Sequence, residues 1–132
     1  MSFRRYQMKI RDNDLSGIVI GSAIRVHSAL GPGLLESAYQ AALTYELRSQ
    51  GWEVQSQVIL PVKYDGKQID NGYRIDLLIE KRLIIEIKSV DQIAPIHQAQ
   101  VLTYLRLSGL KLALLINFNS LLLKDGIRRF IN

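Results

Sequence analysis

The sequence predicts an α/β fold in which one mixed β-sheet is flanked by helices, in the order α-α-β-β-β-α-β. Two segments with helical periodicity come first, and two very apolar segments joined by a charged turn follow them. A third helical segment then leads into an unbroken apolar run. This alternation is typical of a sheet covered by helices. The 132 residues form one predicted domain, residues 1–132, with a short polar segment at residues 1–13.

Two helices are expected before the sheet. The first is predicted from Asp14 to Leu30, with Asp14 as its N-cap, and Gly31-Pro32-Gly33 ends it. The second runs from residue 34 to residue 50, and Gly51 stops it. The residues expected to face the core are Ile20, Ala23, Ile24 and His27 in the first helix, and Leu35, Ala38, Tyr39, Ala42 and Tyr45 in the second.

The rest of the chain supplies the strands and a third helix. Residues 52–63 are extended and β-branched, Tyr64-Asp65-Gly66 is a turn, and residues 68–80 lead into a hairpin. Pro95 suits the first turn of a helix that reaches Ser108 and closes at Gly109. The apolar run 110–118 indicates a strand covered on both faces, reached by a crossover and therefore parallel to the strand of Glu86. Residues 126–131 add an edge strand.

The hairpin carries the candidate site. If Glu80-Lys81-Arg82 is its turn, Asp76 lies directly across from Glu86. Two carboxylates about 5 Å apart repel by about 3 kcal/mol at the effective dielectric of proteins, so the pair opposes folding unless a cation binds. Glu86 and Lys88 share one face, opposite Leu83, Ile85 and Ile87. A register slip of one residue would separate the two acids.

Oxygen ligands of this kind suit a hard cation such as Mg²⁺ or Mn²⁺, which usually takes one or two carboxylates, some carbonyls and water. Such an ion lowers the pKa of bound water and stabilises charge on a transferring phosphoryl group. Lys88 would position or deprotonate the attacking water, or neutralise the phosphate. Phosphodiester hydrolysis is therefore the predicted reaction class. The structural alternative is an ion pair of Lys88 with Glu86 or Asp76, or of Arg74 with Asp76.

Two motifs resemble a known family. Asp76 followed by Glu86-Ile87-Lys88 resembles the PD-(D/E)XK phosphodiesterase superfamily, the fold of restriction endonucleases and many repair nucleases. Gly33-Leu-Leu-Glu36-Ser-Ala-Tyr39 resembles the small bacterial proteins named for their GxxExxY signature, which are placed in that superfamily. The resemblance runs from about His27 to Arg129. It implies a restriction-endonuclease-like sheet and a metal site made by Asp76, Glu86 and the Ile87 carbonyl. Ile75 stands where the superfamily name has proline.

Further site residues come partly from this resemblance. Glu36 opposes the positive end of its helix dipole, worth about 0.5 kcal/mol, and in the superfamily an acid at this place often joins the metal site. Gln100 and Tyr104 share a helix face and resemble the QxxxY element of exonuclease-type members, which lies near the active site. Tyr39 either contacts Glu36 or a phosphate, or belongs to the core. His27 is expected in the core and His97 in solvent.

Composition narrows the partners and the compartment. The formal net charge of +5 and the pI near 9.6 favour an anionic partner, and nucleic acid fits a phosphodiesterase. The absence of cysteine excludes disulfides, thiolate zinc sites and a cysteine nucleophile, and agrees with a reducing cytoplasm. Neither a signal peptide nor a membrane span is expected.

Together these features predict a cytoplasmic, bacterial, Mg²⁺- or Mn²⁺-dependent nuclease that hydrolyses nucleic acid, with DNA as the first expectation. Its catalytic residues would be Asp76, Glu86, Lys88 and Glu36, assisted by Gln100, Tyr104 and Tyr39. A double-strand cut would need two copies, so a homodimer stays open. Two alternatives also stay open: a catalytically inactive nucleic-acid-binding or protein-interaction module on the same fold, and a purely structural ion-pair cluster.

Overall fold

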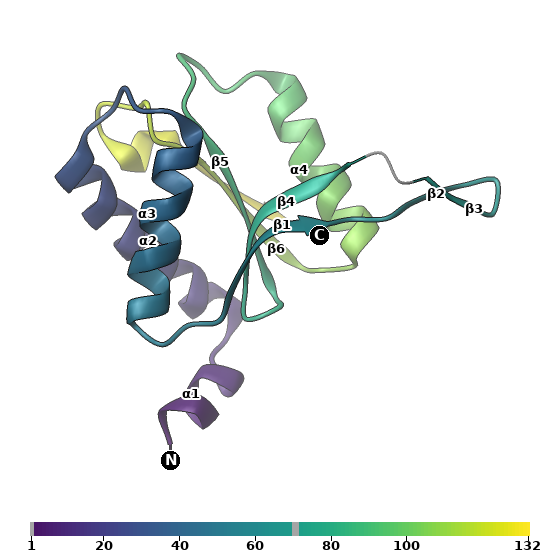
Figure 1. Cartoon of the computed structure of the whole chain (residues 1–132), viewed down its shortest axis with the longest axis horizontal. Coiled ribbons are helices and arrows are strands. Elements are labelled where there is room, and N and C mark those ends of the chain that lie inside the picture. Colours follow the sequence, from purple (N-terminus) through teal and green to yellow (C-terminus); the bar gives the residue numbers. More distant parts are fainter. Residues whose placement is uncertain (1, 70–71) are drawn as a thin grey trace.

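The computed structural model describes residues 2–69 and 72–132, and in this part of the chain five strands form one mixed sheet (Figure 1). The strands are β1 (Val54–Ile59), β4 (Arg74–Ile79), β5 (Leu83–Lys88), β6 (Leu112–Asn117) and β7 (Ile127–Ile131), in the spatial order β1-β4-β5-β6-β7. Only β5 and β6 run parallel, and the other neighbours are antiparallel. This confirms the predicted α/β class with a restriction-endonuclease-like mixed sheet.

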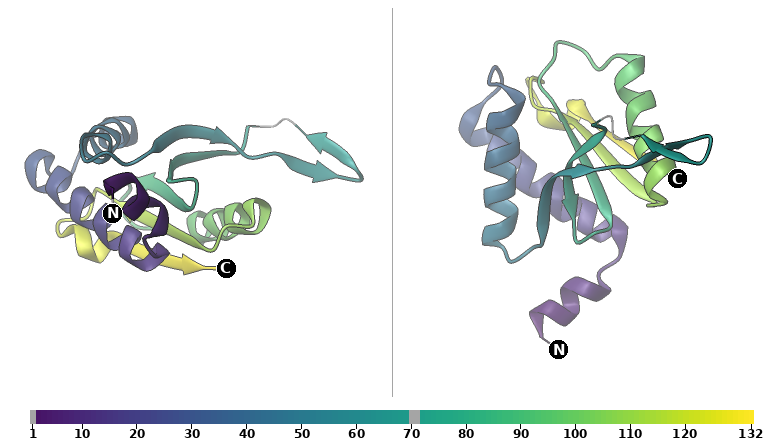
Figure 2. Two further views of the ribbon diagram at one scale, coloured as in Figure 1. Left: turned by 90° about the horizontal axis from the view of Figure 1, so that it is seen from below. Right: turned by 45° about the vertical axis from the view of Figure 1, so that its right-hand side comes forward.

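Helices cover both faces of the sheet. Helices α2 (Asp12–Leu30) and α3 (Glu36–Ser49) lie on one face and α4 (Pro95–Ser108) on the other, as the two views in Figure 2 show. Leu43 of α3 packs with Ile85 of the sheet in the first layer, whereas Leu105 of α4 packs with Ile84 in the second. Successive side chains of a strand point to opposite faces, so β5 contributes to both layers.

The crossover from β5 to β6 agrees with the sequence prediction. Helix α4 begins at Pro95 and ends at Ser108, and its C-cap Gly109 has a φ of 72°, the left-handed conformation that glycine adopts without strain. All six residues of β6 are buried, because helices lie on both sides of that strand. A short 3₁₀ turn, η1 (Leu123–Gly126), leads into the edge strand β7.

The predicted extended segment 52–63 is divided in two. After β1, residues Leu60 and Pro61 separate it from β2 (Val62–Tyr64), which pairs with β3 (Lys67–Ile69) in a two-stranded ribbon. The ribbon projects beyond the sheet, and no residue from 62 to 69 is buried (Figure 1).

The polar start of the chain contains a helix that sequence reasoning missed. Helix α1 (Phe3–Lys9) is capped by Ser2, whose side chain accepts from the Arg5 N–H at 3.1 Å. It docks on the main body through the Gln7 amide, which donates to the Gly51 carbonyl at 2.7 Å. A seven-residue helix is marginal alone, so tertiary contacts must hold it.

The predicted inward faces of the first two long helices are partly wrong. Ile24 is 41% exposed, while Leu35 is 78% and Tyr45 is 75% exposed. Ala38 is also exposed, whereas Ala23 and Tyr39 are buried as predicted. The buried apolar stripes consist of Leu15, Val19, Ala23 and Val26 in α2 and of Tyr39, Leu43 and Leu47 in α3. Both helices carry apolar residues on more than one stripe, and contact with the sheet selects one of them.

The start of α2 also differs from the prediction. The helix begins at Asp12, so Asp14 lies within the first turn and is not the N-cap residue. Arg11 forms an ion pair with Asp14 at 3.1 Å. An acid in the first turn still opposes the helix dipole. None of the helices in the described residues is both long and apolar enough to cross a membrane.

The β4–β5 hairpin has the predicted register. Leu77 pairs with Ile85 and Ile79 with Leu83, so continuing the ladder by one residue places Asp76 opposite Glu86. The turn closes with the Arg82 N–H donating to the Ile79 carbonyl at 3.0 Å.

Candidate active site

Asp76 and Glu86 meet at the open end of the β4–β5 hairpin. The Asp76 N–H donates to Glu86 Oε1 at 3.0 Å, and the Ile87 N–H donates to Asp76 Oδ2 at 2.9 Å. Each acid therefore accepts a hydrogen bond from the backbone of the opposite strand, which fixes the orientation of both carboxyl groups. Glu86 is only 3% exposed and Asp76 is half-buried.

The two carboxyl groups perturb each other. Burial, followed by the nearby charge of Asp76, raises the pKa of Glu86 from 4.5 to about 8. A hydrogen bond between the two side chains adds to this rise, because only a protonated Glu86 can donate to Asp76. Burial also raises the pKa of Asp76, against hydrogen bonds from Ile87 and Gln57. The site therefore holds negative charge at an energetic cost unless a cation is present.

Lys88 lies close enough to lower the pKa of both acids. It is half-buried, and its side chain lies on the same side of β5 as that of Glu86. Among residues 2–69 and 72–132, neither Lys88 nor Arg74 approaches Asp76 or Glu86 as an ion pair within 4.0 Å. The described residues therefore do not form the closed ion pair of the structural alternative.

Glu36 approaches the same site from the first turn of α3. Its Oε2 accepts from the Ser89 N–H at 3.1 Å, which ties the helix start to the end of β5. Its charge contributes to the raised pKa of Asp76. The structure therefore brings this third acid within electrostatic range of Asp76.

Tyr39 lies in the core. Its hydroxyl donates to the Gly31 carbonyl and accepts from the Leu34 N–H at 3.1 Å, so neither partner is Glu36. Its ring stacks on Phe118 with the centroids 4.5 Å apart. Tyr39 therefore holds the loop before α3, and so fixes where Glu36 begins its helix.

Tyr104 reaches the site from α4. Burial, and then the charges of Glu86 and Asp76, raise the pKa of its hydroxyl to about 12, whereas a hydrogen bond with Gln100 lowers it. Tyr104 is 3% exposed. The helix face that carries Gln100 and Tyr104 therefore lies against the two carboxyl groups, although the two motifs are separated in sequence.

Gln57 and Gln40 join the site without a sequence signal. In the β1–β4 ladder, Ser56 pairs with Leu77 and Val58 with Ile75, which puts Gln57 opposite Asp76. The Gln57 amide donates to Gln40 Oε1 at 3.1 Å and reaches Asp76 Oδ1 at 3.5 Å. A glutamine in an alternating strand gives no hint of such contacts, and only its cross-strand position could have indicated them.

The two histidines lie elsewhere. His27 is buried as predicted, and its Nε2 lies 2.8 Å from the Ser120 carbonyl oxygen. The prediction of a solvent-facing His97 is wrong. This side chain is half-buried, and its Nδ1 accepts from the Ala94 N–H at 3.0 Å, because the start of α4 has unpaired backbone donors.

A family model for the PD-(D/E)XK nuclease superfamily matches residues 13–130. The chain belongs to this superfamily. Comparisons with curated proteins and with solved structures found no match. The matched range contains every predicted site residue, and α1 precedes it. The narrower resemblance to the GxxExxY proteins stays a prediction.

Members of the PD-(D/E)XK superfamily typically use a divalent metal ion and act on nucleic acid. Within residues 2–69 and 72–132, no three His, Cys, Asp or Glu side chains are grouped tightly enough to hold a metal ion. The donors present are the carboxyl groups of Asp76 and Glu86. The Ile87 carbonyl joins them, because a strand residue directs its N–H and its carbonyl to the same side and the Ile87 N–H meets Asp76. This set fits a Mg²⁺ site, which needs few protein ligands and keeps several waters.

Proposed function

We propose that this chain is a divalent-metal-dependent phosphodiesterase that hydrolyses nucleic acid, with DNA as the first substrate to test. The observation that carries the proposal is the meeting of the buried Glu86 and the half-buried Asp76, both with raised pKa values, with no ion pair to compensate them among residues 2–69 and 72–132. Such a pair is unfavourable for folding alone but suited to a doubly charged ligand.

Asp76, Glu86 and the Ile87 carbonyl would hold the ion. When bound, Mg²⁺ or Mn²⁺ supplies a more acidic water and a positive charge beside the phosphoryl oxygens. The backbone N–H groups of Asp76 and Ile87 keep the two carboxyl groups oriented before any ligand arrives. Glu36 is held by the Ser89 N–H and would accept hydrogen bonds from water at the same place.

Lys88 would act on the phosphate and on the attacking water. Its ammonium group is near both acids yet unpaired with them, so it can donate to a phosphoryl oxygen as negative charge develops. The pKa of the Tyr104 hydroxyl is raised to about 12, so the hydroxyl keeps its proton at neutral and at alkaline pH and can serve as a donor. Gln100 lies on the same helix face and would orient that hydroxyl.

The direct test is metal-dependent cleavage of short labelled DNA strands, single and paired. Asp76→Ala, Glu86→Ala and Lys88→Ala should each lower the cleavage rate by at least about a thousandfold, since each removes several kcal/mol of transition-state stabilisation. Asp91→Ala and Lys111→Ala remove exposed charges of the same kinds and should leave the rate within about twofold. Wild-type cleavage by any of the three site variants would refute the assignment.

Calorimetric titration with Mn²⁺ separates the nuclease from an inactive binding module on the same fold. The wild-type protein should bind Mn²⁺, and Asp76→Asn or Glu86→Gln should weaken binding by about 10–100-fold, because each removes one anionic ligand. Binding that is equally strong in all three proteins, or absent from all three, would favour the inactive module.

A further inference from the structure

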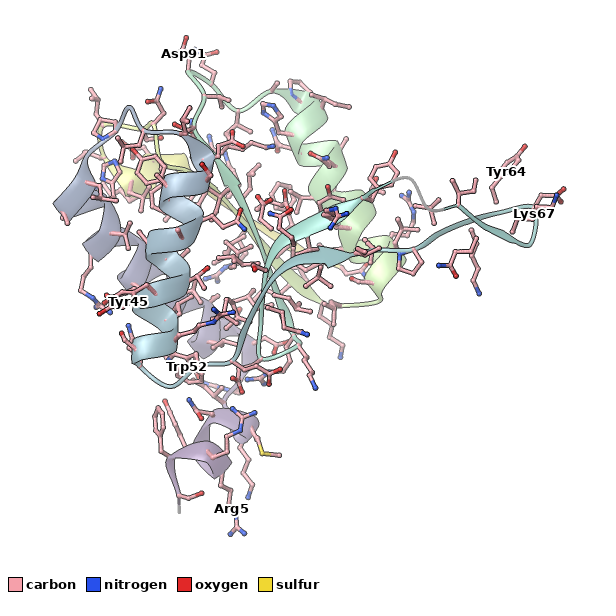
Figure 3. All side chains as sticks on the ribbon, in the orientation of Figure 1. Arg5, Tyr45, Trp52, Tyr64, Lys67 and Asp91 are labelled. Atoms are coloured by element: carbon pink, nitrogen blue, oxygen red, sulfur yellow. The ribbon has the colours of Figure 1, made fainter. Side chains whose placement is uncertain are left out.

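A groove of about 850 Å³ lies between α3 and β1. Its wall combines carbon surface with hydroxyl groups, from Ser37, Thr44 and Ser56, and with the amides of Gln40 and Gln57. Tyr45 is 75% exposed, belongs to the lining, and projects outward from α3 (Figure 3). A groove of this size is in the range of ligand sites in proteins.

The groove adjoins Asp76 through two of its lining residues, Gln57 and Gln40. Gln57 lies at its end and reaches Asp76 Oδ1 at 3.5 Å, while Gln40 Nε2 is 3.5 Å from the Asp76 carbonyl oxygen. The same two glutamines are joined at 3.1 Å. A strand of nucleotides with one phosphate at Asp76 and Glu86 would therefore continue along this wall.

The backbone at the junction is unusual for a strand. Gln57 has a φ of 53° in the middle of β1, a left-handed conformation that non-glycine residues seldom adopt and that costs about 1 kcal/mol or more. This conformation places its exposed side chain at the boundary between the groove and Asp76. Strain of this kind is typical of functional positions.

The chemistry of the wall selects the ligand. Among the lining residues that the structure describes, Arg48 is the only basic one, and its guanidinium donates to the Val54 carbonyl at 2.7 Å. The groove therefore offers little positive charge to bind paired phosphate backbones. Hydroxyl and amide groups instead match the edges of unpaired bases and the sugars, and an exposed tyrosine ring offers a stacking surface.

We propose that this groove binds the unpaired nucleotides that adjoin the phosphodiester held at Asp76 and Glu86. The inference rests on the proposed function.

The test compares two variants with the same change of charge. Ala41 lies in the groove, and Ala29 lies outside it on α2; both are exposed and helical. Binding of a short fluorescein-labelled single strand is measured by anisotropy in EDTA, so that no hydrolysis occurs. Ala41→Glu should weaken binding by about tenfold or more through bulk and repulsion. Ala29→Glu should change it by less than about threefold, because distant exposed charges are screened.

Thermal unfolding of both variants verifies that they fold. Equal effects of the two variants, tighter binding of the paired strand than of the single strand, or no binding by the wild-type protein would each overturn the groove assignment. The outcome is separable from that of the proposed function. If Asp76→Ala abolishes cleavage while Ala41→Glu binds like wild type, only the groove is wrong. If Ala41→Glu weakens binding while Asp76→Ala cleaves normally, only the nuclease site is wrong.

Discussion

Glu86→Gln is expected to stabilise the folded protein above neutral pH and, in the same molecule, to weaken metal binding. The glutamine amide resembles the protonated acid in shape, and its NH₂ group can donate to Asp76 while its oxygen still accepts from the Asp76 N–H. It removes the buried charge without leaving a cavity. Stability and activity should therefore change in opposite directions, as expected where a site is strained for function.

The pH dependence gives this prediction its sign. The pKa of Glu86 rises from 4.5 to about 8 on folding, so between these values the folded state keeps a proton that the unfolded state has lost. The wild-type free energy of unfolding therefore falls as pH increases from about 4.5 to about 8, then levels. In Glu86→Gln, residue 86 does not titrate, so this decrease in the free energy of unfolding with rising pH does not occur. At pH above 8 the variant should be more stable by on the order of 2–4 kcal/mol, since one pKa unit corresponds to about 1.4 kcal/mol.

Urea unfolding at acidic, neutral and alkaline pH, in EDTA, measures this difference. Glu46→Gln is the control, because it makes the same substitution in a carboxylate that is already paired with a cation. Glu46 is 28% exposed and forms an ion pair with Arg25. That variant should be slightly less stable than wild type, by about 0–1 kcal/mol. If Glu86→Gln proves less stable than wild type at alkaline pH, the acids do not oppose folding, and the case for a cation between them fails.

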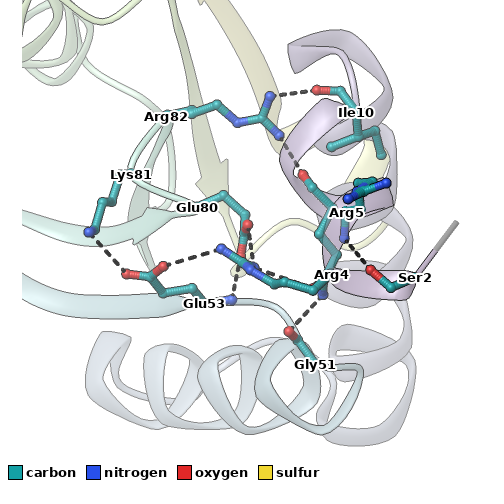
Figure 4. A network of polar contacts seen from close by, with 10 residues as sticks. Ser2, Arg4, Arg5, Ile10, Gly51, Glu53, Glu80, Lys81 and Arg82 are labelled. Atoms are coloured by element: carbon teal, nitrogen blue, oxygen red, sulfur yellow. Dashed lines mark hydrogen bonds and ion pairs between the residues drawn. The ribbon is translucent and has the colours of Figure 1, made fainter.

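Glu80→Ala should destabilise the protein far from the site, with a loss of about 2–4 kcal/mol in the free energy of unfolding. The Glu80 side chain is 3% exposed. It accepts from Arg4 Nη1 at 2.8 Å and from the Glu53 N–H at 2.6 Å, and so joins α1, the start of β1 and the hairpin turn (Figure 4). Alanine would remove both hydrogen bonds and leave the Glu53 N–H without its partner.

Lys81→Ala is the matched control. Glu80 and Lys81 are neighbours in the same turn, with φ values of 52° and 57°, so alanine meets a similar backbone cost at either position. Lys81 is 70% exposed, and its Nζ lies 4.0 Å from Glu53 Oε1, the upper limit for an ion pair. Its loss should therefore cost about 0–1 kcal/mol. Hydrogen exchange of residues 3–9 should become faster in Glu80→Ala alone. Equal stability of the two variants would show that the Glu80 contacts contribute nothing net.

Much of the candidate site could be predicted because it depends on short-range rules. Asp76, Glu86 and Lys88 lie on consecutive strands, so the turn position and the alternation of side chains were enough to bring them together. The crossover helix and the buried strand β6 follow equally from Pro95, Gly109 and an unbroken apolar run. The acid–Glu-x-Lys pattern also identified the superfamily that the family model confirms.

Other members of the site were beyond such rules. Gln57 and Gln40 belong to β1 and α3, and their contact with Asp76 depends on how those two elements meet. Periodicity predicts that Leu35 and Tyr45 face inward with the buried stripe of α3, but both are largely exposed. Helix propensity and periodicity describe one element at a time, whereas burial depends on what that element packs against.

By itself the sequence determined the order of elements, the hairpin register and the pair of acids, because these depend on local periodicity and on distances along the chain. Only the tertiary structure decided that α1 docks through Arg4 on Glu80, that Gln57 and Gln40 contact Asp76, and that a groove adjoins them. These features join segments far apart in sequence. Their free energy comes from buried polar contacts and packing between elements, which no single segment encodes.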